Sequence, residues 1–287
     1  MMKISLDWVN LFPSVHAKFS VSQDTDIRVK RLDKLYAEVF KPELGTVKGV
    51  TAKLHLKGNA TPVFQGPRLV PYALRFAVEE ELKRVENDGV LKPVEASNWA
   101  SLVVCVPKTD GSVRICGEYK GKVNPAIQTE QFAIPALEEI RRRVSSPKKF
   151  AKIDLRSAYQ QLVLYEDSKT VTHKGLFRYT RLPFGISSSP TIWQRFIEQA
   201  LAGLDGTCAI MDDLLVGGFN DDGHLKNLEA VLSHFQKYGL RVKLPQCVFM
   251  VQSAIYFGFL FSEKGLQPGY EKVRAIKEAP APRNMTE

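Results

Sequence analysis

The stretch Thr207-Cys-Ala-Ile-Met-Asp-Asp-Leu-Leu-Val216 places two adjacent acidic residues inside an otherwise apolar run. Its pattern predicts two short strands, Thr207–Met211 and Leu214–Val216, with Asp212 and Asp213 in a tight hairpin turn at the lip of a sheet. Two carboxylates among apolar residues are costly unless a metal ion or another partner neutralises them. We therefore interpret Asp212-Asp213 as part of a functional site.

A second pair of adjacent acids, Asp221-Asp222, serves as an internal comparison. This pair follows Gly-Gly-Phe-Asn and precedes Gly-His, a polar and glycine-rich context that is typical of a solvated loop. Adjacent acids are common in such loops. We expect Asp221-Asp222 to lie in a loop of this kind, which sets it apart from Asp212-Asp213.

Asp154 is a third acidic residue in a special position, because it directly follows the apolar run Phe150-Ala-Lys-Ile153. Carboxylates at the ends of rigid strands are hard oxygen ligands that suit Mg²⁺. Two such ions ~4 Å apart can assist nucleotidyl transfer, one at the attacking hydroxyl and one at the leaving pyrophosphate. Asp154, Asp212 and Asp213 are therefore candidates for a two-metal site.

The rest of the chain predicts an α+β fold, an antiparallel sheet backed by helices. Asp110-Gly111 between two apolar runs, Ala100–Pro107 and Ser112–Tyr119, indicates a β-hairpin. The other elements that we expect are a helix over Pro71–Gly89 with an apolar stripe at Leu74, Val78, Leu82 and Val85, a helix over Pro135–Val144, a strand over Phe150–Leu155, a helix capped by Ser189-Pro190, a helix over His224–Tyr238, a β pair of Val248–Met250 with Ile255–Phe261, and a helical start over Tyr270–Lys277.

Charge and composition favour a polyanionic partner. The chain has 40 Lys and Arg against 31 Asp and Glu, a net charge of +9, and six basic residues without an acid lie between Arg141 and Lys152, beside Asp154. A solvated cationic face is the alternative. No run of about eighteen apolar residues occurs, and the amino-terminal residues do not resemble a signal peptide. The four cysteines lack zinc spacing, so we expect reduced thiols in an intracellular protein, cytoplasmic or nuclear and not secreted.

Five motifs follow one another along the chain: Ser112-Val-Arg-Ile-Cys-Gly-Glu-Tyr-Lys120, Lys152-Ile-Asp-Leu-Arg-Ser-Ala-Tyr-Gln-Gln161, Arg181-Leu-Pro-Phe-Gly-Ile-Ser-Ser-Ser-Pro190, Ile210-Met-Asp-Asp213 and Tyr256-Phe-Gly-Phe259. Together they resemble the Gypsy class of long-terminal-repeat retrotransposon reverse transcriptases, and more distantly the retroviral enzymes. The resemblance covers roughly Leu69 to Pro282. It implies an RNA-directed DNA polymerase, a nucleotidyltransferase that forms part of a pol polyprotein.

The resemblance also implies roles for single residues. Asp154, Asp212 and Asp213 would be the catalytic carboxylates and would bind two Mg²⁺ ions, with Mn²⁺ as a possible substitute. The nucleotide-binding residues would be Lys108 and Arg114 at the triphosphate, Tyr159 at the sugar, and Phe184 and Gly185 along the pocket. The primer-contacting residues would be Ile210, Met211, Phe257 and Gly258. From the residues alone, Lys108 can equally be a turn lysine, Tyr159 a core aromatic, and Phe184-Gly185 a simple turn.

A right-hand polymerase arrangement follows from the same resemblance. It divides the chain into a lead-in or linker that reads as irregular (1–65), part of the fingers (66–150), the palm with the rest of the fingers and the primer-contacting hairpin (151–262), and the start of a thumb (263–287). The implied partners are an RNA or DNA template with its primer and deoxynucleoside triphosphates (dNTPs), with no membrane. The family's polyproteins normally add ribonuclease H and integrase.

Two of several departures from the family pattern, together with the expectation that only the start of a thumb is present, motivate an alternative function. Ile210 stands where the family has tyrosine, and Gln246 stands where it has a lysine that is thought to assist pyrophosphate departure. The alternative is a catalytically impaired or domesticated relic that only binds nucleic acid or a protein partner. A third possibility, an RNA-templated RNA polymerase, is disfavoured by Tyr159 at the sugar position.

Overall fold

A four-stranded antiparallel sheet carries the acidic residues, in the strand order β11–β5–β10–β9. The computed structural model describes residues 23–66, 70–108, 111–144, 147–165, 171–172, 175–270, 273–274 and 278. The four strands are β5 (Lys149–Asp154), β9 (Thr207–Ile210), β10 (Asp213–Gly218) and β11 (Val248–Val251). The predicted hairpin is present, but the predicted position of its turn is wrong by one residue: the turn consists of Met211 and Asp212, and Asp213 already begins β10.

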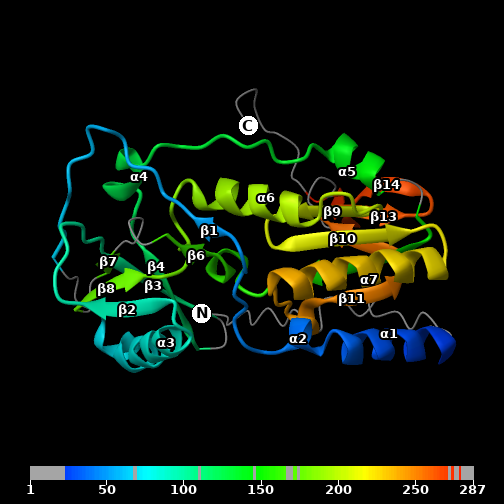
Figure 1. Ribbon diagram of the computed structural model, residues 1–287, viewed down its shortest axis with the longest axis horizontal. Helices are drawn as coiled ribbons and strands as arrows, with labels where there is room; N and C mark the ends of the chain where they lie inside the picture. The colour runs from blue at the N-terminus through cyan, green and yellow to red at the C-terminus, as the bar shows by residue number, and fades with distance from the viewer. Residues whose placement is uncertain are drawn as a thin grey trace.

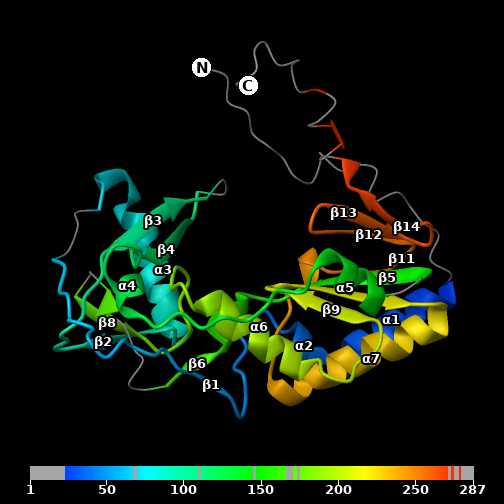
Figure 2. The ribbon, with the colours of Figure 1, turned by 90° about the horizontal axis from the view of Figure 1, so that it is seen from above.

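The two faces of this sheet are covered by different layers. Ala151, Ile153, Leu214 and Val216 face a core that includes residues of two helices, α6 (Ser189–Ala200) and α7 (Asp221–Tyr238). The opposite face packs against α5 (Leu137–Arg143) and the three-stranded sheet of β12 (Ser253–Tyr256), β13 (Phe259–Ser262) and β14 (Gly265–Pro268). Figure 2 shows α7 on one side of the sheet, with α5 and β12–β14 on the other. The period-2 alternation of strand residues explains this division.

The β pair predicted for Val248–Met250 and Ile255–Phe261 is wrong. Strand β11 pairs with β5 instead, and β12 pairs with β13 within the second run. Phe257 and Gly258 have φ angles of 49° and 74°, which form a two-residue hairpin turn and split that run into two strands.

A second lobe lies beside the first along the long axis of the molecule (Figure 1). It holds the short helix η1 (Tyr72–Leu74) and α3 (Arg75–Asn87), in which Val78, Leu82 and Val85 are buried as the apolar stripe predicts. The predicted hairpin is present as β3 (Val103–Pro107) and β4 (Val113–Gly117). The remaining elements of this lobe are α4 (Val123–Ala126), β2 (Leu91–Val94), β7 (Val171–Thr172) and β8 (Leu176–Tyr179), with strand order β2–β8–β7.

The expectation of an irregular segment at the start of the chain is wrong for residues 23–40, whereas most of residues 41–65 are irregular as expected. Two helices, α1 (Gln23–Leu35) and α2 (Ala37–Phe40), precede β1 (Thr51–Ala52), which pairs in parallel with β6 (Val163–Leu164). Tyr36, Val39 and Val47 belong to the main core. Residues 1–22 lie outside the described part of the chain, as does most of the predicted helical start over 270–277. The division into fingers, palm and thumb stays a prediction.

Two smaller expectations about helix starts also need correction. Asp221 and Asp222 form the first turn of α7, where the side chain of Asn220 accepts a hydrogen bond from the Gly223 N–H at 2.7 Å. Negative side chains are favourable at a helix N-terminus, which explains why they lie there and not in a loop. The N-cap position of α6 is occupied by Ser188, whereas the Ser189 hydroxyl donates to the Pro183 carbonyl at 2.8 Å. In the described part of the chain, every helix is too short or too polar to cross a membrane.

Candidate active site

The structure brings the three predicted carboxylate residues together at one end of the sheet. Asp154 is the last residue of β5 and lies opposite Asp213, the first residue of β10. Asp212 occupies the turn just before β10, and its carbonyl accepts a hydrogen bond from the Leu155 N–H at 2.8 Å. Asp154 and Asp213 are partly buried, whereas Asp212 is exposed. Residues far apart in the sequence therefore form one acidic site.

Two buried side chains of α6 fix the turn that presents Asp212. Met211 has a φ of 55°, a left-handed conformation that is unfavourable for a residue with a side chain. The Trp193 indole N–H donates to the Met211 carbonyl at 2.5 Å, and the Met211 N–H donates to Gln194 Oε1 at 2.9 Å. Gln194 Nε2 also donates to the Ala209 carbonyl at 2.8 Å. Sequence reasoning assigned no role to either side chain, although a glutamine on the apolar face of α6 was a signal.

Burial and the neighbouring carboxylates raise the pKa of Asp154 and of Asp213. Burial, followed by the charges of Asp213 and Asp212, raises the pKa of Asp154 from 3.8 to about 6, although Lys243 and Lys152 act in the opposite direction. Burial also raises the pKa of Asp213, against the opposing effect of Lys152, whose Nζ lies 3.1 Å from Asp213 Oδ1. The site thus holds more negative charge than the protein alone neutralises well.

The chemistry of this donor set fits a divalent cation. Three carboxylates on two strands and their turn supply hard oxygen ligands, and a cation would relieve the repulsion that raises the Asp154 pKa. Among the described residues, no three His, Cys, Asp or Glu side chains are gathered closely enough to form a metal site by themselves. Asp154 and Asp212 are the two carboxylates of the site that form no ion pair with a described residue.

Tyr159 and Phe184 lie beside the acidic turn. Their ring centroids are 5.2 Å apart, and the Tyr159 hydroxyl donates to Met211 Sδ at 3.5 Å. Tyr159 follows β5 in the short helix η2 (Ala158–Gln161). Burial and then the charge of Asp212 raise the pKa of the Tyr159 hydroxyl. Tyr159 is only partly buried, so it is an aromatic residue at the edge of the site and not simply part of the core.

Gly185 joins the turn before α6 to the second lobe. Its φ is 91°, and an added Cβ would lie 3.1 Å from the Gly117 carbonyl oxygen and 3.3 Å from the Tyr119 ring. The Asn124 amide donates to the Gly185 carbonyl at 3.0 Å and its oxygen accepts from the Ser187 N–H at 3.0 Å. The close approach that requires glycine here is therefore an approach to β4. Contact with a nucleotide stays a prediction.

Lys108 and Arg114 both lie on the hairpin of β3 and β4, and both are exposed. Arg114 pairs with Val106, and the Lys108 N–H donates to the Ser112 carbonyl at 2.7 Å. Figure 1 shows that β10 begins at the end of its sheet nearer to the lobe with this hairpin. The Arg114 side chain is exposed to solvent, so it is accessible to a ligand.

The four predicted primer-contacting residues differ in accessibility. Ile210 is only 6% exposed and packs in the core with Tyr256 and Phe261, because strand alternation turns it toward β12 and β13. Met211 is partly buried, whereas Phe257 is 46% exposed in its hairpin turn with Gly258. A direct contact through the Ile210 side chain is therefore not supported, while Phe257 is available at the surface.

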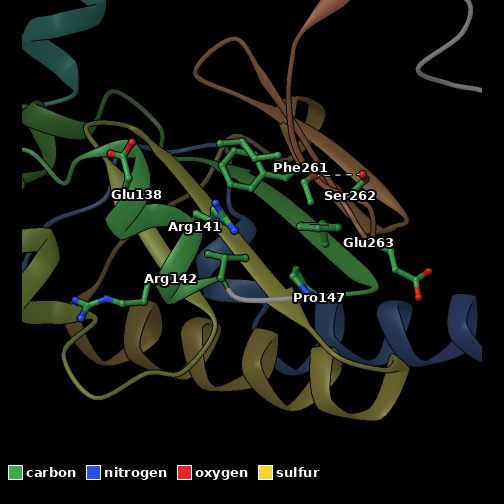
Figure 3. A pocket seen from close by; sticks show the side chains of 11 residues that line it. Glu138, Arg141, Arg142, Pro147, Phe261, Ser262 and Glu263 are labelled. Carbon is green, nitrogen blue, oxygen red and sulfur yellow. Dashed lines mark hydrogen bonds between the residues drawn. The ribbon is translucent and has the colours of Figure 1, made fainter.

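Most of the basic residues before Asp154 are already paired. Ion pairs join Arg143 to Glu139 and Glu198, Lys148 to Glu263, Lys149 to Asp221 and Lys152 to Asp213. Arg141 and Arg142 line a cavity of about 430 Å³ together with Glu138 and Phe261, near the start of β5 (Figure 3). The run of basic residues is therefore not a continuous surface for phosphate groups.

Comparisons with known proteins agree with this architecture. Residues 106–261 match the family model described as reverse transcriptase (RNA-dependent DNA polymerase). An uncharacterised protein of Caenorhabditis elegans is 31% identical over 97% of this chain and 23% of its own length. The retrovirus-related Pol polyprotein from transposon 412 of Drosophila melanogaster is 27% identical over 80% of this chain and 19% of its own length. The chain thus spans less than a quarter of either relative.

A solved structure supports the fold independently. The foamy viral protease-reverse transcriptase in complex with double-stranded DNA aligns with all of this chain and with 52% of its own chain, at a TM-score of 0.82 and 20% sequence identity. At that identity the likeness establishes the fold alone. It confirms the predicted α+β architecture.

Proposed function

The chain belongs to the reverse transcriptase (RNA-dependent DNA polymerase) family, and from this premise we propose that it adds deoxynucleotides to a primer 3′-hydroxyl on an RNA or DNA template. The observation that carries the proposal is the register of Asp154 opposite Asp213, with Asp212 in the adjoining turn. This arrangement concentrates negative charge at one end of a rigid sheet, where a family member needs it for nucleotidyl transfer. The resemblance to retrotransposon pol polyproteins is confirmed, and the Gypsy class is our finer assignment.

Asp154 and Asp212 would hold two divalent ions, Mg²⁺ or Mn²⁺, which when bound polarise the attacking hydroxyl and offset the charge of the phosphates. Asp213 would support this pair from the first position of β10. The role of the protein is to hold these carboxylates rigidly, which Trp193 and Gln194 do by fixing the turn. Rigid positioning matters because phosphoryl transfer depends mainly on geometry and charge.

The nucleotide would lie between the β3–β4 hairpin of the second lobe and the carboxylates of the first lobe. Lys108 and Arg114 would bind the triphosphate, since an anion with several oxygens needs several donors. Tyr159 would crowd a 2′-hydroxyl and so select dNTPs, with Phe184 behind its ring. The proposal predicts that ribonucleotides are incorporated far less efficiently than deoxynucleotides. It also distinguishes this chain from an RNA-templated RNA polymerase.

Template and primer would bind mainly through their phosphates, as the net charge of +9 favours. Met211, Phe257 and Gly258 would contact the primer. Fusion to ribonuclease H and integrase is part of the same proposal, because the chain resembles a Pol polyprotein of which it spans only 19%. An intracellular compartment is proposed as well, since the four cysteines are free thiols.

Primer extension on an RNA template with Mg²⁺ or Mn²⁺ tests the proposal directly. Asp154→Asn and Asp212→Asn should each abolish extension, whereas Asp222→Asn should retain it, because Asp222 is an exposed residue at the start of α7. Extension that survives Asp212→Asn would overturn the assignment of the site.

The relic hypothesis is not favoured by the family match, but the same proteins test it. Filter binding of a primer–template at two salt concentrations would be run beside the extension assay. Tight binding by the wild-type chain without any extension in either metal would support the relic over the polymerase.

A further inference from the structure

We propose that Lys152 is a built-in counter-ion of the carboxylate site, which positions Asp213 and lowers the affinity of the site for divalent cations. The inference rests on the proposed function, because it assumes that the site takes metal ions. Lys152 is a positioning residue in this proposal: it acts through Asp213 and touches no substrate.

Strand alternation places Lys152 on the face of the sheet that carries the acids. Ala151 and Ile153 point into the core on the opposite face, while Lys152 lies two residues before Asp154 on β5. Its Nζ lies 3.1 Å from Asp213 Oδ1, and the two side chains are only 29% and 23% exposed. An ion pair this sheltered is screened less by salt than a surface pair.

The surroundings of Lys152 direct its charge toward Asp213. Its neighbour across β10 is Leu215 and its neighbour across β11 is Val248, so apolar side chains flank it on both sides. An ammonium group between apolar neighbours is stable when it has a carboxylate partner, and Asp213 is that partner among the described residues. Asp213 is held toward Lys152 in turn.

A fixed cation at this place opposes the binding of a second cation. A unit positive charge ~6 Å from a divalent ion, in a water-like dielectric, weakens binding about tenfold. The carboxylates therefore bind metal less tightly than their number suggests. This favours a site that takes up ions together with the triphosphate, whose own negative charge supplies the missing attraction.

The same strand offers a matched control. Lys149 begins β5, forms an ion pair with Asp221 at 3.4 Å, and has a side chain that is 24% exposed. It therefore resembles Lys152 in strand, burial and pairing, but its partner lies at the start of α7, away from the carboxylate turn. Lys149→Met removes an equivalent charge without touching the site.

The test is a direct binding measurement of Mn²⁺ to the metal-free chain, in which the electron paramagnetic resonance signal reports the concentration of the free ion. Lys152→Met and Lys152→Gln should each bind Mn²⁺ about tenfold more tightly than the wild type. Lys152→Arg should restore the wild-type Kd, Lys149→Met should leave it unchanged, and Asp213→Asn should weaken binding. Circular dichroism establishes whether each variant is folded. If Lys152→Met does not fold, Lys152→Gln takes its place in the comparison.

An unchanged or weaker Mn²⁺ affinity in a folded Lys152→Met or Lys152→Gln variant would overturn the inference. Primer extension by the wild type reports separately on the proposed function. If the Kd values shift as expected while no variant extends a primer, the polymerase proposal fails and the counter-ion stands. If the wild type extends primers and the Kd values do not shift, only the counter-ion fails.

Discussion

Replacing Asp154 by asparagine should make the metal-free protein more stable at pH 8 while it abolishes the proposed activity. The reason is that burial and the charges of Asp213 and Asp212 make the ionised carboxylate of Asp154 unfavourable in the folded state. Asparagine has nearly the same shape and carries no charge. Functional sites commonly hold such unfavourable groups at a cost in stability.

The magnitude follows from the raised pKa of Asp154. A rise from 3.8 to about 6 corresponds to ~3 kcal/mol at ~1.36 kcal/mol per pH unit, and solvent screening of a half-buried group reduces this to ~1.5 kcal/mol. A carboxyl group with a raised pKa favours the folded state below pH 3.8, and this contribution is lost as the pH rises through about 6. Asp154→Asn should therefore gain ~1.5 kcal/mol at pH 8 and less than ~0.5 kcal/mol at pH 4.

Urea unfolding followed by circular dichroism, with chelator present, measures this difference at the two pH values. Asp205→Asn is the control, because Asp205 is exposed in the turn before β9 and a surface substitution should change the free energy of unfolding by less than ~0.5 kcal/mol. Added Mg²⁺ should stabilise the wild type and not Asp154→Asn, since binding to the folded state adds to stability.

The reasoning is refuted if Asp154→Asn is less stable than the wild type at pH 8. It is also refuted if the gain has the same size at pH 4 and pH 8, because then charge is not its cause.

Three further predictions follow from single positions. Gly185→Ala should lower the free energy of unfolding by ~1–3 kcal/mol in urea, owing to its φ of 91° and the 3.1 Å approach of an added Cβ to backbone, whereas Gly121→Ala, with open space around it, should change stability little. Arg114→Ala should raise the KM for dNTP about tenfold or more in primer extension with an unchanged Tm, since its side chain is exposed, and Lys92→Ala should not. His224 is fully buried, neither ring nitrogen has a hydrogen-bond partner in the described structure, and burial lowers its pKa from 6.5 to about 4. The contribution of the neutral His224 to stability is complete above pH 6.5 and is lost as the pH falls through about 4. Over that range the free energy of unfolding of the wild type should therefore fall by ~3 kcal/mol more than that of His224→Leu, measured by urea unfolding across pH.

Local patterns in the sequence were sufficient to predict which residues form the centre of the site. The hairpin around Asp212-Asp213 and the strand that ends at Asp154 follow from short apolar runs interrupted by acids, a signal carried by neighbouring residues. The predicted contrast with Asp221-Asp222 holds for Asp213, which is partly buried, but not for Asp212, which is exposed as Asp222 is. A glycine-rich context predicted a loop, whereas Asn220 caps a helix there.

Pairings between distant segments could not be read from the sequence. Strand β11 looks like the first half of a hairpin with the next apolar run, yet it adds to β5, about a hundred residues earlier in the chain. Helix α1 is polar over most of its length, so its periodicity is weak, and it is placed by contacts such as the Arg28–Asp222 ion pair with α7. Gln194 and Trp193 acquire their roles only when α6 packs against the acidic turn.

The departure at Ile210 leaves the charge of the carboxylate site unchanged. Ile210 is packed in the core between the sheet and β12–β13, so its change from tyrosine removes no charge from the carboxylates. Tyr256, from the neighbouring hairpin, donates its hydroxyl to the Asp213 carbonyl at 3.1 Å.

Gln246 ends the short helix η4 (Leu244–Gln246), and its N–H donates to the Lys243 carbonyl at 2.8 Å. Lys243 is the N-cap residue of η4 and precedes Gln246 by one turn. The Lys243 N–H binds the Asp154 carbonyl at 2.8 Å, and the charge of Lys243 lowers the pKa of Asp154 more than that of Lys152 does. Lys243 therefore supplies a positive charge near Asp154, although position 246 holds an uncharged glutamine. The loss at Gln246 is consequently a weaker argument for an inactive relic than the sequence alone suggested.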